Sequence, residues 1–172
     1  MLAIRTAYGN VISNPIVNAC ITERCYQSFG GEHSIAKIYG SRILLSPRGL
    51  DWHFLAHEWS HDEIRERLTF SAWRRLPQWF DDGLAVAISE APEHSEAHWL
   101  WLVQSNLQRP TREELHALNS QRQWSDAVDR FGEIAHNAQR KIQGLPEIRP
   151  VYAAAGHEVR SWLAAAGTLG LI

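Results

Sequence analysis

The sequence predicts an α+β fold in which a small N-terminal sheet, mixed or antiparallel, packs on a mainly helical half. Strand-like material is confined to residues 11–21 and 35–46, and nearly all of the chain after residue 51 has helical hydrophobic spacing. The chain has 172 residues, of which 45% are hydrophobic and 21% charged, so we expect a single domain over residues 1–172 with its own core.

The strand-like regions are joined by a short helical stretch at residues 23–28 and a loop that contains Gly30 and Gly31. Residues 41–46 are expected to form a short strand that runs into a turn at residues 47–49, where Pro and Gly interrupt the pattern. The predicted sheet therefore ends directly before the helical half begins.

A long helix is predicted from Asp51 to Leu68, because Asp51 is a good N-cap and the stretch contains neither Pro nor Gly. Its apolar residues share three- and four-residue spacing with His57 and His61, which places both histidines on the inward face.

Later helices are predicted from the same spacing and from capping signals. They span residues 77–90, 94–107, 125–143 and 150–166, and Thr111 to Glu114 has the form of a capping box. Gly83 and Ala85 are small enough to let a neighbouring helix approach closely.

The most specific feature of the chain is the H-E-x-x-H run at residues 57–61, inside the predicted long helix. Positions i and i+4 lie nearly above one another on a helix, so His57 and His61 can bind one metal ion. Glu58 is rotated by about 100° and can reach a water on that metal. This layout is typical of zinc hydrolases.

A second stretch, Pro77-Gln78-Trp79-Phe80-Asp81-Asp82-Gly83-Leu84-Ala85, follows some twenty residues later. Together with the H-E-x-x-H run it resembles the gluzincin metallopeptidases, the thermolysin-like and aminopeptidase-like zinc enzymes, over residues 16–91. The resemblance implies a zincin-like helical half with His57 and His61 as ligands of Zn²⁺, Glu58 as general base and Asp82 as third ligand. The family has the longer Glu at the position of Asp82, and Asp81 is the rival for that role.

The resemblance also implies roles for the strand before the motif and for the last helix. The strand at residues 41–46 would form the edge of the sheet, where an extended substrate pairs through main-chain hydrogen bonds. Tyr152 and His157 are the candidates for a hydrogen bond to the oxyanion, although a Tyr at a helix start is commonly a packing residue.

The predicted function is therefore zinc-dependent hydrolysis of peptide bonds through a metal-activated water, with a peptide or protein as substrate. The alternative is a catalytically weak or inactive binding module in which zinc is a structural clamp. A chance motif in a helical domain is the third interpretation, and a catalytic core excised from a longer protein is compatible with this length.

Other histidine pairs compete with the motif less well. His94 and His98 are also four residues apart, but the Glu between them points about 200° away from the first histidine. A pair of His53 with His57 would put Phe54 where the base should be, so it would explain binding and no hydrolysis.

Composition and cysteine usage limit the partners. A formal charge of −2 gives no basic surplus for nucleic acid, no apolar run is long enough to span a bilayer, and residues 1–8 lack the apolar core of a signal peptide. Cys20 and Cys25 suit either a disulfide, as in an extracytoplasmic protein, or two buried thiols. The sequence leaves the oligomeric state open.

Overall fold

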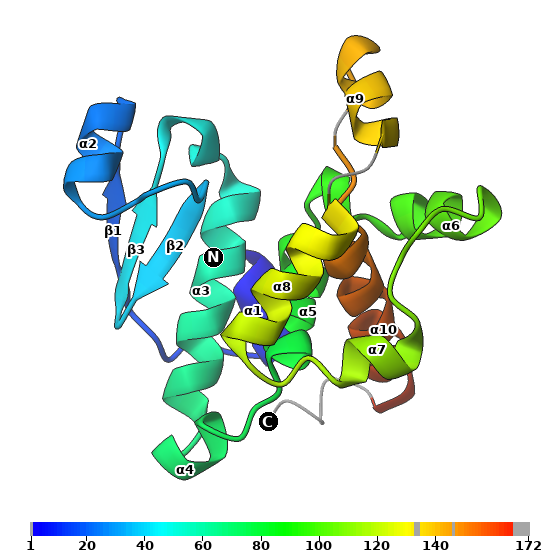
Figure 1. Cartoon of the computed structure of the whole chain (residues 1–172). Coiled ribbons are helices and arrows are strands. Elements are labelled where there is room, and N and C mark those ends of the chain that lie inside the picture. Colours follow the sequence, from blue (N-terminus) through cyan, green and yellow to red (C-terminus); the bar gives the residue numbers. More distant parts are fainter. Residues whose placement is uncertain (1, 133–134, 146, 167–172) are drawn as a thin grey trace. The chain divides into compact units, whose positions relative to one another are not determined.

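The computed structural model describes residues 2–132, 135–145 and 147–166, and it confirms the α+β class (Figure 1). The described residues up to 75 form one compact unit, which contains the sheet, and those from 76 to 166 form a second, helical unit. We call them the N-terminal and C-terminal units and describe each by itself. The single-domain expectation stays a prediction.

The sheet of the N-terminal unit has three strands, β1 (Ile16–Ala19), β2 (Ala36–Tyr39) and β3 (Arg42–Leu45), in the order β1-β3-β2. β1 runs parallel to β3, and β2 runs antiparallel to it, so the sheet is mixed (Figure 1). The expectation that the strand before the motif forms the sheet edge is wrong. β3 is central because β1, from earlier in the chain, hydrogen-bonds to its remaining side.

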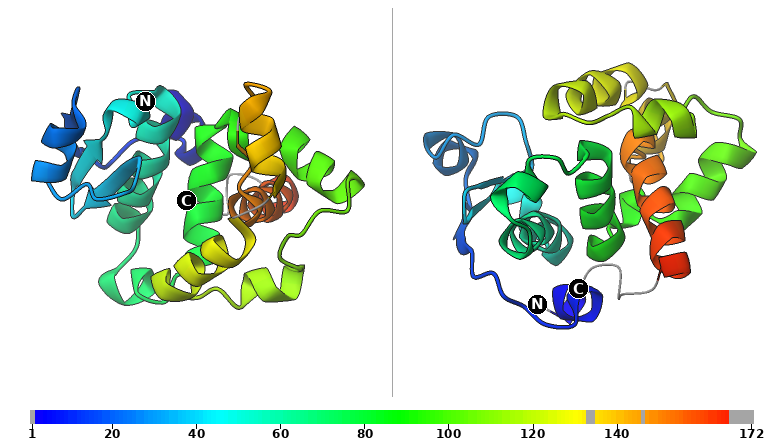
Figure 2. Two further views of the ribbon diagram at one scale, coloured as in Figure 1. Left: turned by 45° about the horizontal axis from the view of Figure 1, so that its top comes forward. Right: turned by 90° about the horizontal axis from the view of Figure 1, so that it is seen from below.

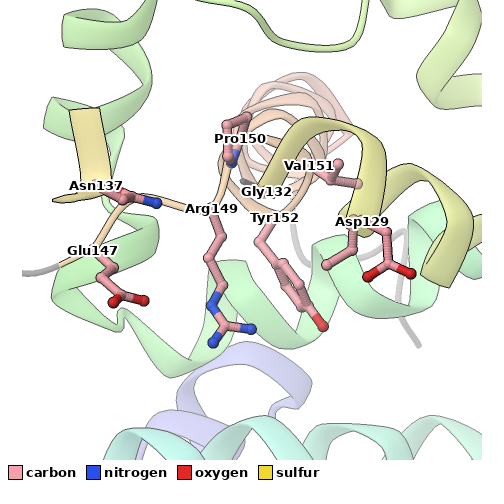
Figure 3. A pocket seen from close by; sticks show the side chains of 9 residues that line it. Asp129, Gly132, Asn137, Glu147, Arg149, Pro150, Val151 and Tyr152 are labelled. Atoms are coloured by element: carbon pink, nitrogen blue, oxygen red, sulfur yellow. The ribbon is translucent and has the colours of Figure 1, made fainter. Parts of the chain in front are cut away.

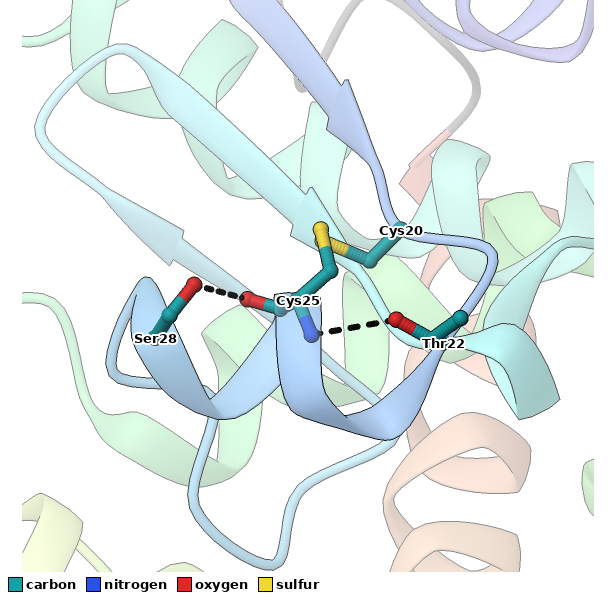
Figure 4. The surroundings of a disulfide bond; sticks show 4 residues. All are labelled: Cys20, Thr22, Cys25 and Ser28. Atoms are coloured by element: carbon teal, nitrogen blue, oxygen red, sulfur yellow. Dashed lines mark hydrogen bonds between the residues drawn. A yellow bond between two sulfur atoms is a disulfide. The ribbon is translucent and has the colours of Figure 1, made fainter.

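A short helix, α2 (Glu23–Ser28), follows β1 at the predicted position and is capped by the Thr22 side chain, which accepts a hydrogen bond from the Cys25 amide. Cys20, directly after β1, and Cys25, in the first turn of α2, form a disulfide (Figure 4). The bond ties α2 to the end of the sheet beside the buried ring of Tyr26. Of the two alternatives for the cysteines, the structure has the disulfide.

The long motif helix, α3, spans Trp52–Arg67, with Asp51 accepting a hydrogen bond from the His53 amide at its start and Leu68 at its end. This confirms the prediction of a helix between Asp51 and Leu68. A 3₁₀ turn (Pro47–Gly49) precedes α3, and the short helix α4 (Phe70–Trp73) follows it. α3 packs against β2, β3 and an N-terminal helix, α1 (Leu2–Tyr8), that the sequence pattern did not reveal.

Polar side chains fasten α3 to the segment that leads from α1 to β1. The Glu63 carboxylate is fully buried and accepts hydrogen bonds from the Ile12 and Ser13 amides, the Ser13 hydroxyl and the Arg67 guanidinium, at 2.6–3.0 Å for the shortest of each. The Trp59 indole also donates to the Ser13 hydroxyl. A buried carboxylate with this many donors fixes the orientation of α3 within its unit.

The described helices of the C-terminal unit are arranged around α10 (Pro150–Ala166), whose predicted limits are confirmed. The others are α5 (Gln78–Ser89), the 3₁₀ turn Pro92–His94, α6 (Glu96–Gln104), α7 (Arg112–His116), α8 (Gln121–Gly132) and α9 (Ala135–Ile142). The predicted capping box at Thr111 is confirmed. Where the sequence predicts one helix over residues 125–143, the described residues form two, α8 and α9. Residues 133 and 134, which lie between them, are outside the described residues.

α5 and α10 pack closely against each other, as Figure 2 shows. A Cβ atom at Gly83 of α5 would come within 2.7 Å of the Ala155 carbonyl oxygen and of Val159 on α10. Gly156 of α10 is in the reciprocal position, because a Cβ there would meet Val86 at 2.4 Å. The prediction that Gly83 permits close approach of a neighbouring helix is confirmed.

Large apolar side chains fill the space around α10. Trp124 and Phe131 of α8 are buried against Val151 and Ala155 of α10.

None of the described helices combines the length and the apolar character that crossing a membrane requires.

Candidate functional site

His57 and His61 lie one turn apart on the half-buried side of α3. Their rings are at 78° to one another with centroids 5.0 Å apart, and the two Nε2 atoms are 3.3 Å apart. The two nitrogen lone pairs can therefore be directed at one point between the rings.

The distance between the two nitrogens fits one zinc ion. Imidazole nitrogens bind zinc at about 2.0–2.1 Å, and two ligands of a tetrahedral centre at that radius lie about 3.3 Å apart. The 3.3 Å between the His57 and His61 Nε2 atoms matches that separation. Spacing in the sequence predicted that these two residues share a face, and the structure confirms it.

Glu58 follows His57 on α3 and is half-buried. Burial raises the pKa of the Tyr26 hydroxyl; its hydrogen bond to Ser34 and the charge of Lys37 act in the opposite direction, and the charge of Glu58 adds to the rise.

Asp82 is on α5, in the C-terminal unit, and only 6% of it is exposed. One carboxylate oxygen accepts a hydrogen bond of 2.6 Å from the Gln78 side-chain amide, one turn earlier, which holds the carboxylate in one orientation. Two imidazole nitrogens and one carboxylate oxygen are a donor set that could hold a divalent ion. Asp81 is less buried than Asp82 and lies on the same helix.

Tyr152 is in the first turn of α10, on the side that faces α8. Its ring is stacked on the ring of His94 at 5.0 Å and meets the edge of Trp124, also at 5.0 Å. The side chain is half-buried, so the ring is a packing element of the C-terminal unit.

His157 lies on another side of α10. Its Nδ1 is 2.6 Å from the Glu96 carboxylate of α6, and its ring is stacked on Trp99 at 4.9 Å. Val159 packs on α5, and His157 is two residues away from it, about 160° around the helix. The structure thus brings His157 to α6 and turns it away from the helix that carries Asp82.

The remaining histidines of the sequence analysis have separate surroundings. His94 belongs to the 3₁₀ turn before α6 and stacks on Tyr152, whereas His98 on α6 has its Nε2 3.2 Å from the Arg140 guanidinium. The ring of His53 lies against that of the neighbouring Trp52, tilted by 37°, with ring centroids 3.7 Å apart.

Acidic residues directly after the motif were missed by the sequence reading. Burial raises the pKa of Asp62, which pairs with Arg65, whereas Glu63 keeps a lowered pKa because hydrogen bonds from Ser13, Ile12 and Arg67 outweigh the effect of burial. The available signal was the spacing of Glu63 and Arg67, four residues apart on one helix. Their partners at residues 12 and 13 are some fifty residues away and leave no local signal.

We compared the chain with models of protein families, with curated proteins and with solved structures, and none of them matches. The interpretation of the site therefore depends on the geometry and chemistry of its own residues.

Proposed function

We propose that this protein is a zinc-dependent metallopeptidase. The observation that carries the proposal is the 3.3 Å separation of the His57 and His61 Nε2 atoms, with Glu58 on the same helix. His57, His61 and Asp82 would hold the ion. When bound, zinc acidifies a water molecule and polarises a carbonyl group.

The protein's own groups move and stabilise charge. Glu58 takes the proton of the attacking water and passes it to the leaving amine. Tyr152 and His157 are the two candidates to donate a hydrogen bond to the oxyanion, and the His157 ring would have to leave Glu96 and Trp99 to do so.

A peptidase is favoured over a domain clamped by zinc because α3 is already fixed in its unit by other means. The Glu63 and Trp59 hydrogen bonds to the segment around Ser13 hold it, and so does the bond between Tyr8 and Ser60. Zinc bound to α3 is therefore not required to hold the helix in place, which favours a catalytic role for the ion over a structural one.

An extended peptide is the proposed substrate, and β2 is the strand that it would pair with. β3 has a strand on each side, whereas β2 has a neighbour in the sheet on one side only. An edge strand beside the motif helix can add one more strand through main-chain hydrogen bonds.

We also propose that the protein works in an oxidising compartment, since disulfides such as Cys20–Cys25 persist there. Quantification of free thiols in the natively produced protein tests this.

The decisive experiment replaces Glu58 with Gln and measures both zinc content and peptide cleavage. We expect one zinc ion per chain, as in the wild type, and a loss of cleavage of about 10²-fold or more, because only the proton acceptor is removed. The matched control is Glu66→Gln, on the exposed side of α3, which should leave both values unchanged. A Glu58→Gln protein that cleaves at the wild-type rate would refute the proposed mechanism.

A further inference from the structure

The C-terminal unit has a pocket of about 200 Å³ where α8 and α9 meet the start of α10 (Figure 3). Its lining includes Asp129, Asn137, Glu147, Arg149, Val151 and Tyr152. The Asn137 side-chain amide is hydrogen-bonded to the backbone of Ile148: it donates to the carbonyl at 2.8 Å and accepts from the N–H at 2.9 Å. These bonds hold the Asn137 wall of the pocket in place, and the volume suits one molecule the size of an amino acid.

Among the described residues of this lining, Arg149 is the one cationic side chain, and it is half-buried. It has no ion pair and no side-chain hydrogen bond with any residue in the described part of the chain. A guanidinium has five N–H donors in a planar arrangement, and two of them can bind both oxygens of one carboxylate. The pocket thus contains a preformed partner for an anionic group.

The backbone beside Arg149 favours an anion as well. The Arg149 carbonyl accepts the first hydrogen bond of α10, from Ala153, so this residue is the N-cap and the first turn lines the pocket. The first amides of a helix have no partner inside the helix, and the dipole of the 17-residue α10 is positive at this end.

Two carboxylates flank the guanidinium. Figure 3 shows Glu147 on one side of Arg149 and Asp129 on the other side, beyond Tyr152. Both carboxylates are exposed, and neither forms an ion pair with another described residue. Together with Arg149 they give the described lining of the pocket a formal charge of −1. A phosphate would be repelled by them, whereas an ammonium group would be attracted.

We infer that this pocket binds a small zwitterion, an α-amino acid, with its carboxylate on Arg149 and its ammonium group on Asp129 or Glu147. Val128, Pro150 and Val151 would receive an apolar side chain. The inference does not rest on the proposed peptidase function. Tyr152 lines the pocket, but none of the groups assigned to the carboxylate or to the ammonium group belongs to the proposed metal site.

The test titrates the full chain with four probes by isothermal titration calorimetry, in the presence of a chelator so that bound metal cannot contribute. Leucine carries both charges, leucinamide lacks the carboxylate, N-acetylleucine lacks the ammonium group, and inorganic phosphate is the anion control. We expect leucine to bind, and each of the other three to bind at least about tenfold more weakly.

Variants assign the two charges to residues. Arg149→Gln should weaken leucine about tenfold or more, and Arg149→Lys should restore part of the loss, because Lys keeps the charge without the two-pronged geometry. The double variant Asp129→Asn, Glu147→Gln should weaken leucine and should not weaken the anionic N-acetylleucine, which the two carboxylates repel. Arg122→Gln is the control for the loss of one positive charge. Arg122 is exposed on α8, as Asp129 is, but it is not among the residues that line the pocket.

Folding of each variant is checked by its thermal midpoint, which should stay at the wild-type value because the replaced pocket groups have no ion pair or side-chain hydrogen bond with another described residue. The inference is overturned if leucine shows no saturable binding up to about 20 mM. It is equally overturned if leucinamide binds as well as leucine, or if a folded Arg149→Gln protein retains wild-type affinity.

Discussion

At the scale of single residues, the site depends on side chains whose orientation is set by a few neighbours. His57 and His61 meet because of helical spacing alone, and Asp82 is oriented by Gln78 one turn before it. Asp81 and Asp82 are adjacent in sequence, but a helix directs neighbouring side chains about 100° apart, so only one of them can face a given ion.

Zinc affinity should therefore separate the two aspartates. We expect Asp82→Asn to weaken zinc binding at least about tenfold, because it removes the one anionic ligand of the proposed set, while Asp81→Asn leaves the affinity unchanged. Competition with a chromophoric chelator measures both. The reverse order of effects would assign the third ligand to Asp81.

Glu158 allows a test of pH dependence away from the site. Burial acts to raise the pKa of its carboxylate, but the hydrogen bonds and charge of Arg112, together with His116, bring the pKa below its ordinary value of 4.5. A lowered pKa in the folded state means that the stabilisation is complete above pH 4.5 and is lost as the pH falls through the folded value.

We expect Glu158→Gln to lower the free energy of unfolding at pH 7 by about 1 kcal/mol, a small value because Arg112 is largely exposed and the pair is screened. The difference from the wild type should vanish towards pH 3, as urea unfolding across the pH range would reveal. Glu113→Gln, at an exposed position of α7, serves as control. A difference that persists at pH 3 would exclude the ion pair as its cause.

At the scale of helices and strands, small residues and caps determine how elements meet. Gly83 of α5 and Gly156 of α10 bring two backbones together, and the buried helix α10 is in turn contacted by α6, α7 and α8. The C-terminal unit therefore depends on a close crossing that tolerates little added volume.

Replacement of Gly83 by Ala measures this crossing. The added methyl group would lie 2.7 Å from the Ala155 carbonyl oxygen, and backbone cannot move aside as a flexible side chain can. Even after the better helix propensity of Ala, we expect a loss of about 1–2 kcal/mol in the free energy of unfolding by denaturant. A Cβ at Gly132 of α8 would meet no described atom within 4 Å, so Gly132→Ala should be neutral or slightly stabilising. Equal effects of both variants would contradict this account.

At the scale of the whole molecule, the question is how metal binding and folding are coupled. The N-terminal unit has a disulfide, a sheet and a buried carboxylate network, and the C-terminal unit has an apolar core around α10. Both sets of contacts join protein groups to one another, and they are extensive enough that we expect each unit to fold before an ion binds.

Removal of zinc should accordingly leave the far-UV circular dichroism spectrum unchanged at 25 °C. Added zinc should raise the thermal midpoint in a concentration-dependent way, by an amount that corresponds to about 2.7 kcal/mol at a hundred times the dissociation constant. Unfolding of the chain on chelation would instead identify the zinc as a structural clamp.

The sequence by itself determined what depends on neighbours within one or two turns. The limits of α3 and α10, the capping box at Thr111 and the shared face of His57 and His61 follow from caps, breakers and helical period, which are local properties.

Only the tertiary structure decided which elements come together. It made β3 a central strand, joined Cys20 to Cys25, drew His157 to Glu96, and buried Glu63 against the segment around Ser13. The strand order and the partners of His157 and Glu63 are set by contacts between residues tens of positions apart, and such contacts leave no periodic signal in a single chain. The two cysteines are close in sequence, but their pairing requires the end of β1 and the start of α2 to pack together, which spacing alone left open.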